Sequence, residues 1–307
     1  MKKDLLTLDE LSSAGIEAIL ALAGELKAKQ KDGVEQRLLA GKSIALIFEK
    51  PSTRTRISFE VGIFQLGAHP VYLSHQDMQL SRGETIEDTA RVLSRYVDAI
   101  IVRTFEQADL ERMADASTVP VINALTDRYH PCQALTDVFT IKEKKGSFSG
   151  LKFAYLGDGN NVCHSLLLAA AKVGLTMWVA TPEGFSPREE VVDRAKEIGR
   201  KTGSEIVVTR EPIMAAENAD ILYTDVWVSM GDEGEKEARL QVFRPYQVNG
   251  ELVSHAKEKV LIMHCLPAHR GEEITGDVID GPNSVVFAQA ENRLHAQKAL
   301  LVHLLQG

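Results

Sequence analysis

The sequence predicts an α/β fold of two doubly wound domains, each with a parallel sheet and helices on both faces. Short apolar runs of strand type alternate with longer runs whose apolar residues recur at helical spacing. This alternation occurs twice, and a polar stretch at residues 142–147 separates the two halves. A length of 307 residues suffices for two hydrophobic cores.

The composition is that of a soluble globular protein, with 44% hydrophobic and 25% charged residues. The net charge of −8 argues against nucleic acid or an anionic membrane as a partner. Acidic residues interrupt the apolar stretch near the N-terminus, so no signal peptide is predicted, and Lys172 interrupts the best candidate for a membrane span. The three cysteines lack metal-site spacing, so we expect reduced thiols, no metal and a cytoplasmic location. No cofactor is expected.

The first half begins with a capping box at Thr7–Glu10, which predicts a helix from about residue 8 to residue 29. Four strands are predicted, at residues 43–48, 70–74, 99–102 and 119–122. Pro120 indicates that the fourth strand begins there or lies at an edge. A further helix is expected to begin near Ile57, a polar loop lies at residues 75–84, and the other helices are predicted at residues 85–96, 108–116 and 134–145.

The second half repeats the pattern and ends in an amphipathic helix at residues 292–305. Its strands are predicted at residues 152–156, 176–180, 205–208, 221–224, 260–264 and 285–287. We place the domains at residues 1–146 and 147–307, and expect the last helix to pack back on the first domain.

The stretch Glu49–Arg56 joins the first strand to the following helix and contains three hydroxyl side chains and two arginines. Free N–H groups and the positive end of the helix dipole favour an anion at such a position. Arg54 and Arg56 add planar donors suited to phosphate oxygens. The stretch therefore predicts a phosphate site that is not a P-loop; the alternative is an ordinary Ser/Thr N-cap with solvated arginines.

Ligands of open parallel sheets bind at the carboxyl ends of the strands, and unusual polar side chains follow almost every predicted strand here. Scaffold loops are rich in Gly, Pro, Asn and Asp, but not in repeated Arg, His and Cys. The segments selected by this rule are Ser52–Arg56, Arg103, His130–Gln133, Gly157–Asn161, Asp225–Gly231, Cys265–Pro267 and Glu291–Arg293.

Gly157–Val162 raises an alternative, because a Gly-x-Gly sequence after a strand is typical of dinucleotide binding. The third glycine position is occupied by Val162, and the next strand is followed by Thr181 and Pro182 rather than by an acid. A nicotinamide enzyme is therefore the less favoured interpretation.

Four motifs in this order, Ser-Thr-Arg-Thr-Arg, His-Pro-Cys-Gln, Asp-x-Trp-x-Ser-Met-Gly and His-Cys-Leu-Pro, resemble the aspartate/ornithine carbamoyltransferase family over essentially the full length. The resemblance implies a carbamoyl-phosphate domain, an ornithine domain and an active-site cleft between them. It also implies homotrimers or assemblies of trimers. The implied reaction transfers a carbamoyl group from carbamoyl phosphate to the δ-amine of L-ornithine, in arginine metabolism.

The resemblance also implies the residues of each substrate site. Arg103, His130, Cys265 and Asp225 are expected to act in catalysis. The carbamoyl-phosphate ligands are expected to be Ser52, Thr53, Arg54, Thr55, Gln79, Arg103, His130, Pro131, Cys132, Gln133, Cys265, Leu266 and Arg293. Those for ornithine are Asn161, Asp225, Ser229 and Met230.

The residue types fit these roles. Arg103, His130 and Thr55 can donate to the oxygen that becomes negative in the tetrahedral intermediate. Asp225 suits an α-ammonium group, whereas an aspartate-using relative would need a cationic pocket for a second carboxylate. The Leu266–Pro267 bond is expected to be cis. N-acetylornithine and putrescine remain alternative acceptors. The alternative from a different functional class is a catalytically inactive homologue that only binds or regulates.

Overall fold

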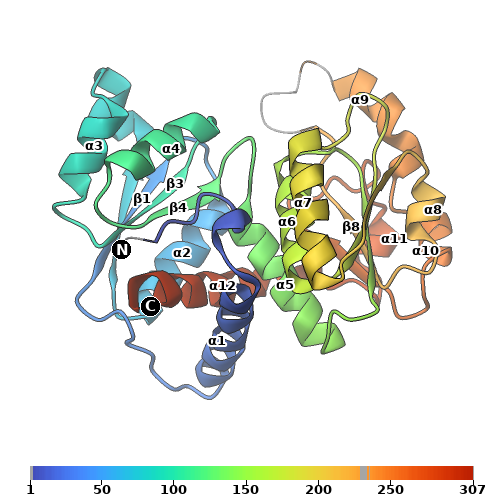
Figure 1. The fold of residues 1–307 in the computed structure, drawn as a ribbon, viewed down its shortest axis with the longest axis horizontal. Coiled ribbons are helices and arrows are strands. Elements are labelled where there is room, and N and C mark those ends of the chain that lie inside the picture. The colour runs from blue at the N-terminus through green and yellow to red at the C-terminus, as the bar shows by residue number, and fades with distance from the viewer. Residues whose placement is uncertain (1–2, 229–233, 235, 307) are drawn as a thin grey trace. The chain divides into compact units, whose positions relative to one another are not determined.

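The computed structural model describes residues 3–228, 234 and 236–306, and shows two α/β units, each with a parallel sheet (Figure 1). Unit 1 comprises Met1–Phe139 with Glu291–Gly307, and unit 2 comprises Thr140–Ala290. Their division falls within helix α5 (Pro131–Lys145), before the polar stretch at which the domain boundary is predicted. The last helix, α12 (Val286–Gln306), is also divided, and most of it belongs to unit 1.

Unit 1 has a four-stranded parallel sheet in the order β2-β1-β3-β4. The strands are β1 (Ser43–Phe48), β2 (His69–Ser74), β3 (Ala99–Arg103) and β4 (Val121–Leu125). All four predicted strands are therefore confirmed: the bounds of β1 are as predicted, and those of the other three move by at most three residues. β4 is an edge strand that begins after Pro120, in agreement with the missing N–H of proline.

Helices cover both faces of this sheet, with α3 and α4 on one side and α2 and α12 on the other (Figure 1). Ile47, Ile100 and Val102 point to the first side and pack against Leu110 and Met113 of α4. The helices are α1 (Ser13–Lys31), α2 (Thr53–Gln65), α3 (Ile86–Leu93) and α4 (Gln107–Ala116). The predicted polar loop contains two 3₁₀ turns, η2 (His75–Asp77) and η3 (Gln79–Arg82).

The first predicted helix is two elements rather than one. The capping box at Thr7 is present, but it caps a 3₁₀ turn, η1 (Leu8–Glu10). Leu11 is extended, and the side chain of Ser12 then accepts from the Gly15 N–H at 3.0 Å and caps α1. The expected start at residue 8 was wrong because a second N-cap lies only five residues after the first.

Helix α12 is bound to unit 1 by a buried lysine. Lys298 is fully buried, and its Nζ donates to Gln30 Oε1 at 2.8 Å and to Gln65 Oε1 at 3.0 Å. Burial lowers the pKa of Lys298 to about 8. Neutral amide oxygens thus fix the last helix to α1 and α2.

Unit 2 has a five-stranded parallel sheet in the order β7-β6-β5-β8-β9. The strands are β5 (Lys152–Leu156), β6 (Thr176–Ala180), β7 (Ile206–Thr209), β8 (Ile221–Thr224) and β9 (Leu261–His264). Its further helices are α6 (Asn161–Val173), α7 (Glu189–Thr202), α8 (Pro212–Ala216), α9 (Lys236–Phe243), η5 (Arg244–Tyr246), α10 (Gly250–Ser254) and α11 (Gly276–Ile279). The predicted strands agree closely, apart from the last.

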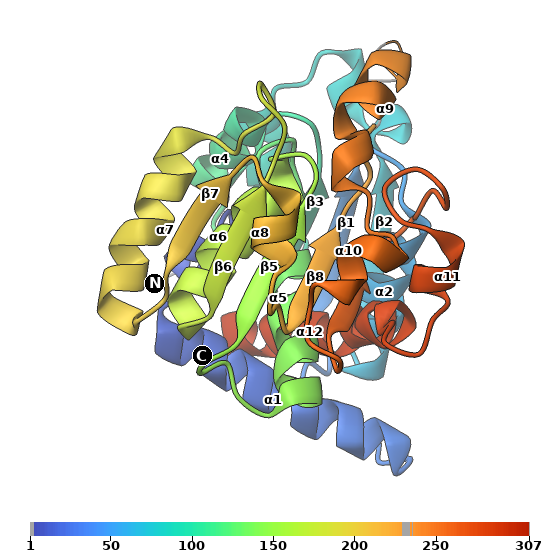
Figure 2. The ribbon, with the colours of Figure 1, turned by 90° about the vertical axis from the view of Figure 1, so that its right-hand side faces the viewer.

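The helices of unit 2 lie on both faces of its sheet, with α6 and α7 on one side and α8 and α10 on the other (Figure 2). Ala154 and Leu156 point to the side of α8 and α10, where they pack with Ala215, Leu222 and Leu252. Residues between them along β5 point to the opposite face, as the two-residue period of a strand requires. The doubly wound fold is thus confirmed within each unit.

The predicted strand at residues 285–287 was wrong. Ser284 forms only an isolated bridge to Ile262, and α12 begins at Val286. The Gln289 N–H already donates to the Val285 carbonyl at 2.8 Å, as in a helix. Three apolar residues are too few to distinguish a strand from the start of a buried helix.

No helix in the described ranges is long and apolar enough to cross a bilayer.

Candidate active site

The turn after β1 forms the N-terminus of α2. Ser52 is its N-cap, and the Ser52 Oγ accepts from the Thr55 N–H at 3.3 Å and donates to Thr55 Oγ1 at 3.0 Å. Thr55 is buried, whereas Thr53 is exposed and Arg54 is partly exposed. The helix start therefore presents N–H groups, three hydroxyls and the guanidinium of Arg54 where the dipole favours an anion.

Arg293 connects this turn to the start of α5. Its Nη2 donates to Thr55 Oγ1 at 2.9 Å, and its Nη1 donates to Gln133 Oε1. The Gln133 Nε2 in turn donates to Asp137 Oδ1 at 2.8 Å. Arg293 and Gln133 are almost fully buried, so α12 brings a cation to two segments predicted to bind the same ligand.

Arg103 and His130 lie at the carboxyl ends of β3 and β4 and are both buried. The Arg103 Nε donates to the Lys50 carbonyl at 3.2 Å. Burial, followed by the charges of Arg293 and Arg103, lowers the pKa of His130 well below its usual range. His130 is therefore a neutral imidazole near pH 7 and can donate only one N–H.

Other predicted residues of unit 1 differ in their contacts. The Cys132 thiol donates to the Asn123 carbonyl at 3.3 Å, and burial raises its pKa to about 12, so this thiol is a neutral structural group. Arg56 pairs with Glu60 at 3.1 Å, and its guanidinium lies 3.5 Å from the Tyr72 ring centroid, so it is engaged by neighbouring side chains of unit 1.

The structure does not bring Gln79 into this group. Gln79 begins η3, and its side chain is exposed. Within the described part of the chain, its backbone carbonyl bonds to Gly83 and Glu84, but no contact joins its side chain to the Ser52 turn.

Lys50 is a buried residue of the turn that sequence reasoning did not assign to the site. Its Nζ pairs with Asp127 and lies 4.1 Å from the Phe105 ring centroid, and its carbonyl accepts from Arg103. The charge pair fixes the end of β1 relative to the segment after β4. Its only signal in the sequence is the position of Lys50 directly after a strand.

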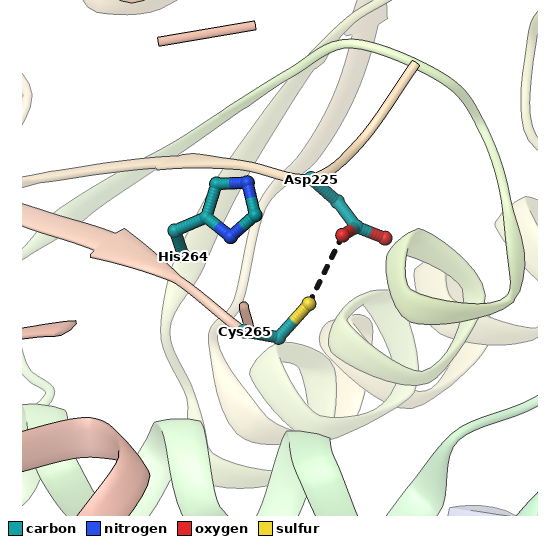
Figure 3. Close-up of side chains that lie close together, drawn as sticks. All are labelled: Asp225, His264 and Cys265. Atoms are coloured by element: carbon teal, nitrogen blue, oxygen red, sulfur yellow. Dashed lines mark hydrogen bonds between the residues drawn. The ribbon is translucent and has the colours of Figure 1, made fainter. Parts of the chain in front are cut away.

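Unit 2 has its own polar group, at the ends of β8 and β9 (Figure 3). Asp225 is buried, and its Oδ1 accepts from the Cys265 Sγ at 3.0 Å. Its Oδ2 accepts from the Asn160 Nδ2 at 2.9 Å. Two predicted catalytic residues, Asp225 and Cys265, are therefore in direct contact.

Asn160 was missed by sequence reasoning, which selected its neighbour Asn161. Asn160 caps α6 through its Oδ1, which accepts from the Val162 and Cys163 N–H groups at 3.0 and 3.1 Å. Its Nδ2 remains available for Asp225. Asn161 is the first helical residue and is partly exposed.

The glycines near Asn160 have a packing role. A Cβ added to Gly159 would lie 2.2 Å from the backbone N of Pro187, because the segment 185–187 crosses directly over this position. Gly157 has φ +137°, a conformation unfavourable for other residues. The chain itself therefore explains the Gly-x-Gly sequence, which removes the main support for a dinucleotide site.

The loop after β9 contains Cys265 and the cis peptide bond between Leu266 and Pro267, which confirms the predicted isomer. Asp225, His264 and Cys265 offer ligand atoms within 4.8 Å of one another. Both ring nitrogens of His264 are already engaged, Nδ1 with the Leu266 N–H at 2.8 Å and Nε2 with Glu273 at 3.1 Å. The group is thus a poor metal site.

The predicted ornithine residues Ser229 and Met230 lie outside the described residues. Trp227, just before them, is buried and stacks on Phe243 with ring centroids 5.7 Å apart. Arg239 also secures this segment: its Nε donates to the Trp227 carbonyl at 2.6 Å and its Nη2 pairs with Asp158.

Comparison with known proteins identifies the family of this chain. Residues 3–143 match the carbamoyl-P binding domain of aspartate/ornithine carbamoyltransferases, and residues 149–304 match their Asp/Orn binding domain. The ornithine carbamoyltransferase of Anoxybacillus flavithermus is 59% identical over 303 residues, which are 99% of this chain and 96% of that protein. That of Bacillus thuringiensis subsp. konkukian is 57% identical over 99% of this chain and 95% of that protein.

Solved structures lead to the same family. The ornithine carbamoyltransferase of Pyrococcus furiosus superposes with a TM-score of 0.97 at 56% identity, covering 100% of this chain and 98% of that chain. The enzyme of Gloeobacter violaceus gives a TM-score of 0.89 at 50% identity, covering 99% of each chain. The protein described here therefore belongs to the aspartate/ornithine carbamoyltransferase family.

Proposed function

We propose that this protein is an ornithine carbamoyltransferase. It transfers the carbamoyl group of carbamoyl phosphate to the δ-amine of L-ornithine and releases L-citrulline and phosphate. The names of its relatives at 57–59% identity support this activity. The polar groups of the two units supply matching chemistry, one for the carbamoyl donor and one for the amine acceptor.

The observation that carries the proposal is the buried junction of Arg293 with Thr55 and Gln133. Carbamoyl phosphate has a phosphate dianion next to a carbonyl group, so its site needs cations and N–H donors for one part and neutral donors for the other. The start of α2, with Ser52, Thr53 and Arg54, provides for the phosphate. Gln133, together with backbone groups of Pro131 and Cys132, provides for the carbamoyl group.

Arg103, His130 and Thr55 are the proposed donors to the carbonyl oxygen. That oxygen gains negative charge as the amine adds, and fixed donors in a water-poor site stabilise it. Because the pKa of His130 is lowered by burial and by two arginines, it acts as a neutral donor rather than as an imidazolium. The positive charge of the site comes from Arg103 and Arg293.

Asp225 is the proposed partner of the ornithine α-ammonium group, with Ser229 and Met230 beside it and Asn161 on the α-carboxylate. Cys265 and the Leu266 carbonyl are proposed to contact the reacting δ-amine and the carbamoyl NH₂. The Cys265 thiol already donates to Asp225, so it orients polar groups and is not proposed to form a covalent bond.

The reaction requires the neutral δ-amine, since an alkylammonium with a pKa of about 10 has no lone pair for attack. The amine nitrogen forms a C–N bond to the carbonyl carbon, the C–O bond to phosphate breaks, and the leaving phosphate takes the proton. No cofactor is needed, because the leaving group is already activated.

The direct test is citrulline formation from carbamoyl phosphate and L-ornithine, run beside aspartate, putrescine and N-acetylornithine. We expect ornithine to be used and the other three amines to be used poorly. Preference for another amine would keep the donor site and overturn the acceptor assignment. Binding of carbamoyl phosphate without transfer to any amine would instead establish an inactive homologue.

We further propose a homotrimer or an assembly of trimers, a cytoplasmic location and a role in arginine metabolism. An exposed apolar row on α2, made of Ile57, Val61 and Phe64, supports association between copies of the chain. Its members are 51%, 38% and 75% exposed and recur at helical spacing on one face.

A further inference from the structure

The loop that carries Cys265 has an unfavourable backbone conformation. Leu266 has φ +59°, in the left-handed region that residues with a Cβ rarely adopt. Such a conformation persists only where neighbouring groups fix it. The neighbour that does so here is His264, whose Nδ1 accepts the Leu266 N–H at 2.8 Å.

This hydrogen bond determines the tautomer of His264. Because Nδ1 accepts a backbone N–H, it has no proton of its own, and the neutral ring carries its hydrogen on Nε2. Nε2 lies 3.1 Å from Glu273 Oε1, so the ring donates to the carboxylate. The side chains of both residues are completely buried.

Glu273 is itself held firmly by backbone groups. Its carbonyl accepts from the Val248 N–H at 2.9 Å, and its Oε1 accepts from the His269 N–H at 2.6 Å. The backbone N–H of His264 donates to Gln289 Oε1 at 3.0 Å, which fixes the backbone from which the imidazole extends. The carboxylate and the imidazole thus have little freedom to rearrange.

A buried carboxylate is costly and is not needed for packing alone, since an apolar side chain of the same size would fill the space. The carboxylate instead accepts a hydrogen bond from Nε2 of His264, and this bond keeps the proton of the imidazole on Nε2. With the proton on Nδ1, the ring could not accept the Leu266 N–H. The Leu266 conformation, and with it the position of the adjacent Cys265, therefore depends on Glu273.

We propose that Glu273 is a positioning residue of this protein, which fixes His264 so that Leu266 and Cys265 keep their places beside Asp225. The role rests on the proposed function, in which Cys265 and Leu266 face the reacting amine. Glu273 touches neither substrate, and acts through His264.

Two substitutions of Glu273 separate positioning from packing. Glu273→Gln keeps an oxygen that can accept from His264, whereas Glu273→Met fills similar space without an acceptor. Glu272→Gln is the matched control, because Glu272 is adjacent but pairs with Lys236 at 2.8 Å and makes no described contact with His264. We expect full activity from the control.

The first readout is alkylation of Cys265 by iodoacetamide, followed by peptide mass mapping. Cys132 and Cys163 are buried, so Cys265 is the accessible thiol of the three. We expect Glu273→Met to raise the alkylation rate about tenfold, as local opening of a protected loop does, and Glu273→Gln to leave it nearly unchanged.

The second readout is kinetic. Glu273→Met should lower kcat about 100-fold by misplacing reacting groups, while KM for carbamoyl phosphate stays within about twofold. Glu273→Gln should restore most of kcat. Equal losses in both variants together with a lowered melting temperature, or unchanged values in Glu273→Met, would overturn the proposal.

His264→Asn provides an independent test of whether Glu273 acts through His264. The Asn oxygen occupies nearly the place of Nδ1 and can accept the Leu266 N–H without reaching Glu273. In this background, Glu273→Gln and Glu273→Met should change kcat and alkylation no further. A further loss as large as in the parent protein would refute action through His264.

The alkylation pattern is independent of the reaction. If the protein forms no citrulline while Glu273→Met still exposes Cys265, the proposed function fails and the positioning inference stands. If citrulline forms normally while Glu273→Met changes neither the alkylation of Cys265 nor kcat, the proposed function stands and the positioning inference fails.

Discussion

Arg293 shows how a residue remote in sequence completes a site that begins at Ser52. It lies 238 positions from Thr55 in the chain, yet its Nη2 is 2.9 Å from the Thr55 hydroxyl. Its guanidinium reaches Gln133 as well, so two loops depend on one side chain.

Arg103→Ala should lower kcat about 100- to 1,000-fold, because it removes a donor to the developing oxyanion. The matched control is Arg56→Ala, since Arg56 belongs to the Ser52 turn but is paired with Glu60. Initial rates of citrulline formation and thermal melting are the measurements. Unchanged kcat in Arg103→Ala, or an equal loss in Arg56→Ala, would contradict the role.

His130 should make stability depend on pH. Its pKa in the folded protein is well below the usual value, so the unfolded chain binds the proton more readily. Stability is therefore complete above the unfolded pKa of about 6.5 and falls as pH drops below it, with a slope of up to about 1.4 kcal/mol per pH unit.

The comparison variant is His130→Gln, which has no titrating group. Urea unfolding at several pH values between 4.5 and 8 should give a difference between the two proteins that is constant above pH 7 and shrinks below pH 6.5. A pH-independent difference would show that His130 is not held neutral.

Local residue types predicted one class of site residue and missed another. Ser52, His130 and Asp225 follow strands and carry unusual chemistry, so their places could be recognised from the chain alone. Lys50, Asn160 and Glu273 act through partners 77, 65 and 9 positions away, and nothing in their neighbouring residues indicates those partners. The assignment of Gln79 to carbamoyl phosphate remains a prediction, because its side chain is exposed and makes no described contact with the Ser52 turn.

At the scale of elements, helix starts form both polar groups. α2 begins with Ser52 as its cap and α6 begins with Asn160, each directly after a parallel strand. Strand positions were predicted well because buried parallel strands are short, continuous apolar runs. The strand prediction at residues 285–287 was wrong for the same reason, because the start of a buried helix shows the same apolar pattern over three residues.

Gly159→Ala should destabilise the protein by about 2–3 kcal/mol, because the new methyl group meets backbone that cannot yield cheaply. Gly24→Ala is the matched control in helix α1, where the added Cβ lies 3.9 Å from Phe139 and should stabilise by about 0.5–1 kcal/mol. Urea unfolding measures both. A tolerated Gly159→Ala would revive a ligand role for this glycine.

At the scale of the whole molecule, each unit has a complete parallel sheet, but unit 1, unlike unit 2, is built from two separate segments of the chain. Unit 1 takes its last helix from the far end of the sequence. The two-part organisation was predictable from the repeated alternation of strands and helices. The packing of the last helix on unit 1 depends on contacts such as that of Lys298 with Gln30, and the spacing of residues in the sequence does not reveal these contacts.

The proposed trimer gives a prediction at this scale. Phe64→Glu should lower the native mass toward that of the 33.8 kDa chain, because it places a charge in the apolar row on α2. Phe287→Glu is the control, since Phe287 is 70% exposed but lies outside that row. Light scattering measures the mass, and a wild-type monomer would refute the assembly.

The late position of Arg293 and Lys298 also bears on how the protein is made. A ribosome synthesises the chain from its N-terminus, so Thr140–Ala290 is complete before α12 has been fully translated. Unit 1, although its first strands emerge earliest, must wait for the final residues before its last helix and Arg293 are in place. A chain cut short by a premature stop before α12 would thus lack Arg293, and with it the contacts that join Thr55 to Gln133.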